Sequence, residues 1–139
     1  MVRVLVLGVL VLLGAAGCAG FASDRAIKIE DTAHLYADCL RFGNVDLAAT
    51  MVEAARRPDF LKFFGDPDER AIRFTSIDVA HVDVSPGAER ATVLLNVRLY
   101  RLPSVSEISL TDRTEWRFDR KEAAWRVEPD LELYERAGR

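Results

Sequence analysis

The sequence is poor in the residue types that build metal and redox sites. It contains two cysteines and two histidines in 139 residues, and none of them stand at the spacing of a zinc site. It also lacks the Gly-x-Ser-x-Gly motif, a phosphate-binding glycine loop, and a nucleophile placed beside a base. We therefore expect no metal, no cofactor, and no enzyme class that depends on these motifs.

Positive charge is not in excess either. The chain has 19 lysines and arginines against 22 acidic residues, a formal net charge of -3. A nucleic-acid-binding domain normally shows a basic face, so nucleic acid is not an expected partner. Half of the residues are hydrophobic, which is too many for a disordered chain, and the length allows one domain.

A long apolar run is missing as well. The longest run, residues 4–13, is about half of the roughly 20 residues that span a membrane. Arg3 precedes it, and the small residues of Ala15-Ala16-Gly17-Cys18 follow. A basic start, a short apolar core and a small-residue end are typical of a secretory signal peptide.

The end of this segment resembles the bacterial lipobox, in which the peptide is cut before the cysteine and the cysteine is acylated. The resemblance implies lipidation at Cys18, with 1–17 as signal peptide, 18–23 as lipidated tether and 24–139 as a single domain. Ala19 stands where an inner-membrane retention signal has Asp, which implies the periplasmic face of the outer membrane. Ordinary cleavage near Cys18, which would give a soluble periplasmic protein, is the alternative.

The second cysteine bears on the same question. A lipid on Cys18 leaves Cys39 without a partner, and a single thiol in an oxidising compartment is best tolerated when it is buried. A Cys18–Cys39 disulfide is the competing interpretation.

Hydrophobic periodicity predicts helices first and strands afterwards. A period near 3.6 indicates a helix from Ser23 or Asp24 to Phe42, in which Leu35, Cys39 and Phe42 widen the buried stripe. Further helical segments are expected at 44–57 and 59–65. From residue 71 the period is 2, and strands are expected at 77–84, 91–99, 108–118 and 125–127. A slip of the apolar phase near Ala80-His81 indicates a β-bulge.

Short turns between the strands make neighbours antiparallel. The sequence therefore predicts an α+β domain with its N-terminal helices packed on one face of a curved four-stranded antiparallel meander.

This order of elements resembles the nuclear transport factor 2-like (SnoaL-like) superfamily, and specifically its small uncharacterised bacterial lipoproteins. The resemblance rests on the helix junction 42–48 (FGNVDLA) and on the strand segments 114–118 (TEWRF) and 124–130 (AWRVEPD). It implies a cone-like, cystatin-like fold whose concave sheet face lines a pocket. The superfamily includes isomerases and dehydratases as well as binding modules, so the fold does not choose a function.

One carboxylate falls in an otherwise apolar strand face. Asp112 shares its face with Trp116 and Thr114, and a carboxylate there is costly unless it is paired or reaches water. With a hairpin turn at 103–106, Asp112 would lie across from Val97. The resemblance implies an acid in the pocket, so the possible pocket residues are Tyr36, Asp112, Thr114 and Trp116. The alternative is that Asp112 lies near a strand end, caps a loop, or pairs with an arginine.

Other candidates are assigned to the surface or the core. His34 and Asp38 are four residues apart on a helix, and His81 and Asp83 flank the bulge, but both pairs point away from the apolar stripes. Trp116 and Trp125 are expected to be cross-strand neighbours that fill the core.

Two functions remain open on the sequence. The first is a non-enzymatic lipoprotein that binds a protein partner or a small apolar ligand. The second is an isomerase or hydratase that uses Asp112 as a base. A pocket filled by phenylalanines 60, 63 and 64 and the tryptophans favours the first, whereas a cavity with two or more convergent ionisable groups favours the second. A homodimer through the exposed row Thr92, Leu94, Asn96, Arg98 and Tyr100 is a further possibility.

Overall fold

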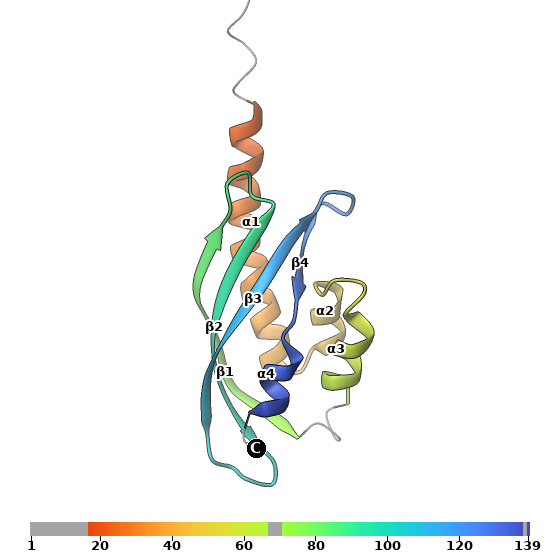
Figure 1. The fold of residues 1–139 in the computed structure, drawn as a ribbon, viewed down its shortest axis with the longest axis vertical. Helices are drawn as coiled ribbons and strands as arrows, with labels where there is room; N and C mark the ends of the chain where they lie inside the picture. The colour runs from red at the N-terminus through yellow and green to blue at the C-terminus, as the bar shows by residue number, and fades with distance from the viewer. Residues whose placement is uncertain (1–16, 67–70, 138) are drawn as a thin grey trace, which may run out of the picture.

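The computed structural model describes residues 17–66, 71–137 and 139. Apart from Gly17, the predicted signal peptide lies outside the described residues. The elements follow one another as α1 (Gly17–Phe42), α2 (Val45–Thr50), α3 (Arg57–Phe64), β1 (Ile72–Val84), β2 (Arg90–Arg101), β3 (Ile108–Asp119), β4 (Ala124–Glu128) and α4 (Leu131–Arg136) (Figure 1).

The four strands form one antiparallel sheet in the order β1-β2-β3-β4. The long helix α1 lies along one face of this sheet, and α2 and α3 lie beyond its β4 edge (Figure 1). The predicted α+β fold with a four-stranded antiparallel meander is confirmed. The predicted bulge is confirmed too, since the β1–β2 register shifts between Val79 and His81, and a second shift lies between Phe74 and Ser76.

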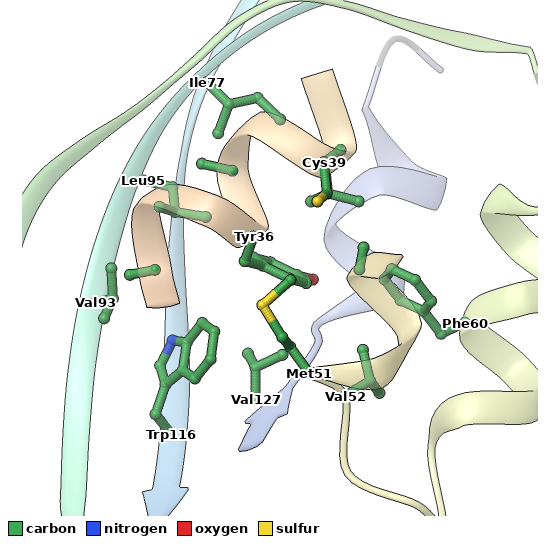
Figure 2. Packing of buried hydrophobic residues seen from close by; sticks show 14 of the residues in the cluster. Tyr36, Cys39, Met51, Val52, Phe60, Ile77, Val93, Leu95, Trp116 and Val127 are labelled. Atoms are coloured by element: carbon green, nitrogen blue, oxygen red, sulfur yellow. The ribbon is translucent and has the colours of Figure 1, made fainter. Parts of the chain in front are cut away.

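The core lies between α1 and the sheet. Strand β2 alternates strictly: Ala91, Val93, Leu95, Val97 and Leu99 are buried, whereas the residues between them face outward. These side chains meet the helix stripe that contains Tyr36 (Figure 2). Period 2 on the strand and period 3.6 on the helix therefore build a common apolar layer.

Helix α1 ends where the sequence indicated. Gly43 has a φ of 76°, a left-handed conformation that favours glycine. The turn lets the Asn44 N–H donate to the Cys39 carbonyl at 2.8 Å, and the Asn44 side chain then caps α2.

The first helix differs from the prediction in two respects. It begins at Gly17, so residues 18–23, the predicted tether, are helical. Cys39 is buried as predicted, but Leu35 and Phe42 are 47% and 73% exposed. The sheet covers only the side of α1 that carries Ala33, Ala37 and Leu40, and the other two positions turn away from it. Within the described part of the chain, no helix is both long enough and apolar enough to cross a membrane.

Helix α4 was not predicted. The Asp130 side chain caps it by accepting from the Leu133 N–H at 3.2 Å, and its one buried residue is Tyr134. This helix packs at the end of the sheet opposite the start of α1 (Figure 1).

Candidate functional site

Asp112 lies in the middle of β3, not at a strand end. It is 2% exposed and faces inward, and it pairs with Leu95 and not with Val97. The predicted partner was wrong by two residues because the last pair of the hairpin is Leu99 with Ile108, so the connection is centred one residue earlier than the predicted turn at 103–106. A shift of two residues keeps every side chain on its face, so the inward orientation was predicted correctly.

The partner of Asp112 is a tyrosine from α4. The Tyr134 hydroxyl donates a hydrogen bond to Asp112 Oδ2 at 2.5 Å, a distance typical of a bond to an ionised acceptor. Asp112 Oδ1 has no hydrogen-bond partner among the described residues. The alternative of a pairing with arginine is not observed, since none of the ion pairs between described residues includes Asp112.

Arg101 binds the C-terminal end of α4. Its Nε donates to the Ala137 carbonyl at 2.6 Å, and its Nη2 donates to the carbonyls of Tyr134 at 2.6 Å and Glu135 at 3.2 Å. These are the carbonyls that a helix leaves unsatisfied at its C-terminus. The short helix is therefore fixed to the sheet by a guanidinium at its end and by a buried hydroxyl in its middle.

Burial dominates the electrostatics of this cluster. Burial raises the pKa of Asp112 from 3.8 to about 6. The hydrogen bond from Tyr134 lowers this pKa, and the charge of Asp130 raises it by a smaller amount. Burial first, and the Asp112 charge second, also hold the pKa of Tyr36 and of Tyr134 well above the usual range. Both tyrosines are therefore neutral at physiological pH, and Asp112 is the group that titrates.

The four predicted pocket residues do share one interior surface. Tyr36 packs edge-on against Trp116, with ring centroids 5.5 Å apart (Figure 2). Trp116 Nε1 donates to Thr114 Oγ1 at 2.9 Å, and that hydroxyl donates to the Val93 carbonyl at 3.2 Å. The polar groups of Thr114 and Trp116 are thus satisfied inside the fold and are not directed at a ligand.

The space beside Asp112 is filled by aromatic rings. Phe60 packs on Phe64, and Phe64 packs on Tyr134, with centroids 5.1 and 5.7 Å apart. Phe60 also lies 6.3 Å from the Tyr36 ring (Figure 2). Neither of the two cavities described below is lined by Asp112.

The tryptophans are core residues, as predicted, and are 3% and 1% exposed. They are not cross-strand neighbours, however, because Trp116 pairs with Val127 and Trp125 pairs with Phe118. Trp125 Nε1 donates to the carbonyl of Arg25 in α1. This bond ties the β3–β4 hairpin to the first helix.

A cavity of about 560 Å³ opens between α3, the start of β1 and α4. Phe63, Ile72 and Leu131 supply its apolar surface. Its charged residues are Asp59, Lys62, Arg101, Glu132 and Glu135. The side-chain charges of the lining are therefore three carboxylates, one ammonium and the Arg101 guanidinium, which is hydrogen-bonded to helix carbonyls.

A second cavity, of about 410 Å³, lies on the outer face of the sheet. Its lining combines Val97 and Leu110 with six polar or charged residues: Ser76, Asp78, Asn96, Arg98, Ser109 and Thr111. Arg98 Nε donates to Ser76 Oγ at 3.0 Å, and Arg98 Nη1 lies 3.7 Å from Glu107. This face carries the row through which a homodimer is possible; Asn96 and Arg98 are exposed, and Thr92, Leu94 and Tyr100 are partly buried.

The remaining candidates lie where the sequence placed them. His34, Asp38, His81 and Asp83 are exposed, so their surface assignment is confirmed. No group of three or more potential metal ligands occurs within the described residues. Cys39 is buried, and burial raises the pKa of its thiol. The Cys18 side chain lies outside what the structure describes.

Comparison with known proteins finds no family model and no curated protein that matches the chain. Among solved structures, the chain is similar to the solution structure of a SEC-C motif containing protein from Rhodopseudomonas palustris. The TM-score is 0.56 and the identity 18%, and the match covers 80% of this chain and 85% of that chain. At this identity the likeness concerns the fold alone.

The predicted membership of the nuclear transport factor 2-like superfamily is therefore wrong. A solved structure that shares this fold is described as a SEC-C motif protein. The segments that suggested the superfamily are a glycine-terminated helix and two amphipathic strands, which many α+β domains contain. The comparisons also give no support to a signal peptide or a lipid anchor, which rest on the sequence alone.

Sequence reasoning missed Tyr134 and Arg101, the two residues that close the Asp112 site. A signal for the first was present, since Asp130 stands at a capping position and Leu131 and Tyr134 follow at helical spacing. Arg101 carried no such signal, because its partners are backbone carbonyls 33 to 36 residues away.

Proposed function

We propose that the chain is a non-enzymatic binding module held at the periplasmic face of the outer membrane by a lipid on Cys18. Support for the anchor comes from the sequence of residues 3–18. The observation that supports a non-enzymatic module is the bond between Asp112 and Tyr134. Through this bond Asp112, the acid predicted for catalysis, is held inside a core filled by aromatic rings. No substrate reaches the Asp112 carboxylate in this conformation.

The cavity between α3, β1 and α4 is the binding site that we favour. Its volume of about 560 Å³ lies in the range of small-molecule sites, roughly 300–1,000 Å³. Three carboxylates against two cations, Lys62 and the carbonyl-bonded Arg101, leave the lining with an excess of one negative charge, which favours a ligand with a cationic end. The proposed ligand is therefore a small apolar molecule that carries an amine.

The binding proposal is tested by calorimetric titration with decylammonium and, for comparison, decanoate. Decylammonium is expected to bind, and decanoate more weakly. Ala71 lines the cavity, so Ala71→Trp is expected to abolish binding. Ala55 is exposed and outside the cavity lining, so Ala55→Trp is the matched control and leaves binding unchanged. Absence of binding, or binding that survives Ala71→Trp, rules the site out.

The anchor is tested separately by incorporation of radiolabelled palmitate. The parent chain is expected to take up label, and Cys18→Ala is expected to take up none. Label that does not depend on Cys18 contradicts the anchor without affecting the cavity.

One observation favours the enzymatic alternative. The pKa of Asp112 is raised to about 6, as in carboxyls that act as acids or bases, and its Oδ1 has no described partner. Catalysis would require α4 to leave its position and expose the acid. Hydrogen exchange of α4 that is as slow as that of the central strands would exclude this alternative.

A further inference from the structure

Three arginines stand in direct cross-strand register on the outer face of the sheet. Arg90 on β2 pairs with Arg117 on β3, and Arg117 pairs with Arg126 on β4. Ala91, Trp116 and Val127, their neighbours in sequence, are buried, so the alternation of the strands directs all three arginines outward. We name these three residues the arginine row.

This arrangement is unfavourable for the isolated domain. Like charges directly opposite one another destabilise a sheet, and adjacent strands are only about 4.8 Å apart. Among ion pairs between described residues, the row receives one carboxylate, Glu53, at 3.8 Å from Arg117. Arg126 donates to the Thr50 carbonyl, which neutralises no charge.

The neighbouring rung on the same face is acidic, since Glu115 on β3 stands opposite Glu128 on β4. Glu115 lies 3.2 Å from Arg113 Nε and accepts from the Thr92 hydroxyl at 3.1 Å. At the tip of the neighbouring hairpin, Arg120 pairs with Glu89. The arginine row is thus a run of three cations in cross-strand register that shares one ion-paired carboxylate, Glu53.

The arginine row lies at the end of the domain from which α1 projects. Trp125, beside Arg126 in sequence, is bonded to the Arg25 carbonyl, and Lys28 donates to the Ala123 carbonyl. These bonds place the β3–β4 hairpin beside residues 25–28 of α1. From there the helix continues past the strands toward its first residue (Figure 1). Seven residues separate Arg25 from Cys18, or about 10 Å at 1.5 Å per residue.

We infer that the arginine row binds the phosphate groups of anionic lipid head groups in the membrane that holds the anchor. This inference rests on the proposed lipidation of Cys18. A distance of about 10 Å is close to the Debye length at moderate salt and is within reach of an extended arginine. Guanidinium groups bind phosphate oxygens in pairs. The membrane thereby places negative charge against the outward ends of the three guanidinium groups.

The test measures co-sedimentation of residues 18–139, carrying Cys18→Ala, with lipid vesicles. This span contains the entire described core, and the mutation removes the anchor from the measurement. The protein is expected to bind vesicles that contain phosphatidylglycerol and to leave vesicles of pure phosphatidylcholine unbound. Binding is expected to weaken as salt is raised.

Variants of the row identify the surface responsible. Each of Arg90→Gln, Arg117→Gln and Arg126→Gln is expected to lower the partition coefficient about fivefold, the effect of one basic residue near an anionic surface. Arg113→Gln, with the same charge change on the same face of β3, is the matched control and is expected to change it less than about twofold. Equal effects of Arg113→Gln and Arg117→Gln would overturn the inference, as would unchanged binding of the triple variant.

Free phosphate is distinguished from lipid in the same preparation. Saturable binding of inorganic phosphate to the arginine row, without binding to phosphatidylglycerol vesicles, would overturn the membrane assignment. The palmitate experiment reports on the anchor independently. Absence of label from the parent chain, with vesicle binding intact, contradicts the anchor alone. Label that depends on Cys18, with no vesicle binding, contradicts the arginine row alone.

Discussion

The buried Asp112 makes the stability of the domain depend on pH in an unusual direction. Its pKa is about 6 in the fold against an ordinary value of 3.8, so the folded state holds the proton more tightly than the unfolded chain does. The resulting stabilisation is complete below the unfolded pKa and is lost as the pH rises through the folded pKa. The difference between the two pKa values corresponds to about 3 kcal/mol in the free energy of unfolding.

The Asp112→Asn variant isolates this contribution, because the other carboxylates titrate identically in both proteins. The amide is neutral at every pH and can still accept a bond from the Tyr134 hydroxyl. We therefore expect the unfolding free energy of the parent, minus that of the variant, to fall by about 2.5 kcal/mol between about pH 4 and pH 7. Urea unfolding followed by the fluorescence of the buried tryptophans measures both curves.

A second variant tests the role of the hydrogen bond. The bond from Tyr134 lowers the pKa of Asp112, so Tyr134→Phe is expected to raise it further and to move the loss of stability to higher pH. The reasoning is refuted if the difference between parent and Asp112→Asn is constant within about 0.5 kcal/mol across this range. A difference that grows with pH would show that Asp112 is stabilised as a carboxylate.

Three other changes are expected to have measurable effects. Arg101→Met removes three hydrogen bonds to helix carbonyls. We expect the free energy of unfolding to fall by about 2–3 kcal/mol and hydrogen exchange in α4 to become faster. Unchanged exchange in α4 would contradict the role of Arg101. Phe60→Ala empties a fully buried site and is expected to cost about 3–5 kcal/mol in urea unfolding, whereas a cost below about 1 kcal/mol would mean that the core collapses around it. The Cys39 thiol is buried and its pKa is raised, so it is expected to react with a disulfide reagent far more slowly in the folded protein than in urea, and equal rates would show that the core opens.

Local patterns predicted the parts of the fold that local physics decides. The period of 2 predicted which residues of β2 and β3 face inward, and the opposed phases of Val79 and Val82 predicted the bulge that the register shows at His81. The glycine at position 43 predicted the end of α1. These features need only side-chain periodicity and one residue with a left-handed φ.

Features that depend on distant contacts were missed. Helix α4 has six residues, too few to be stable without tertiary packing, so its sequence carries a weak signal. The same argument explains the Asp112 site. The sequence indicated that the carboxylate is buried, but its partner Tyr134 lies 22 residues away in that short helix. The superfamily was misassigned because its motifs describe element order, and element order is shared widely among unrelated proteins.

The two surfaces proposed for binding lie at opposite ends of the sheet. Arg90 begins β2 and belongs to the arginine row, whereas Arg101 ends the same strand and lines the cavity. Eleven residues of extended chain separate them by roughly 36 Å. An anchor on Cys18, with the arginine row against the head groups, therefore directs the cavity away from the membrane and toward the aqueous space. A ligand would then be taken from solution and not from the bilayer, which agrees with a cavity that combines an apolar surface with several charged side chains.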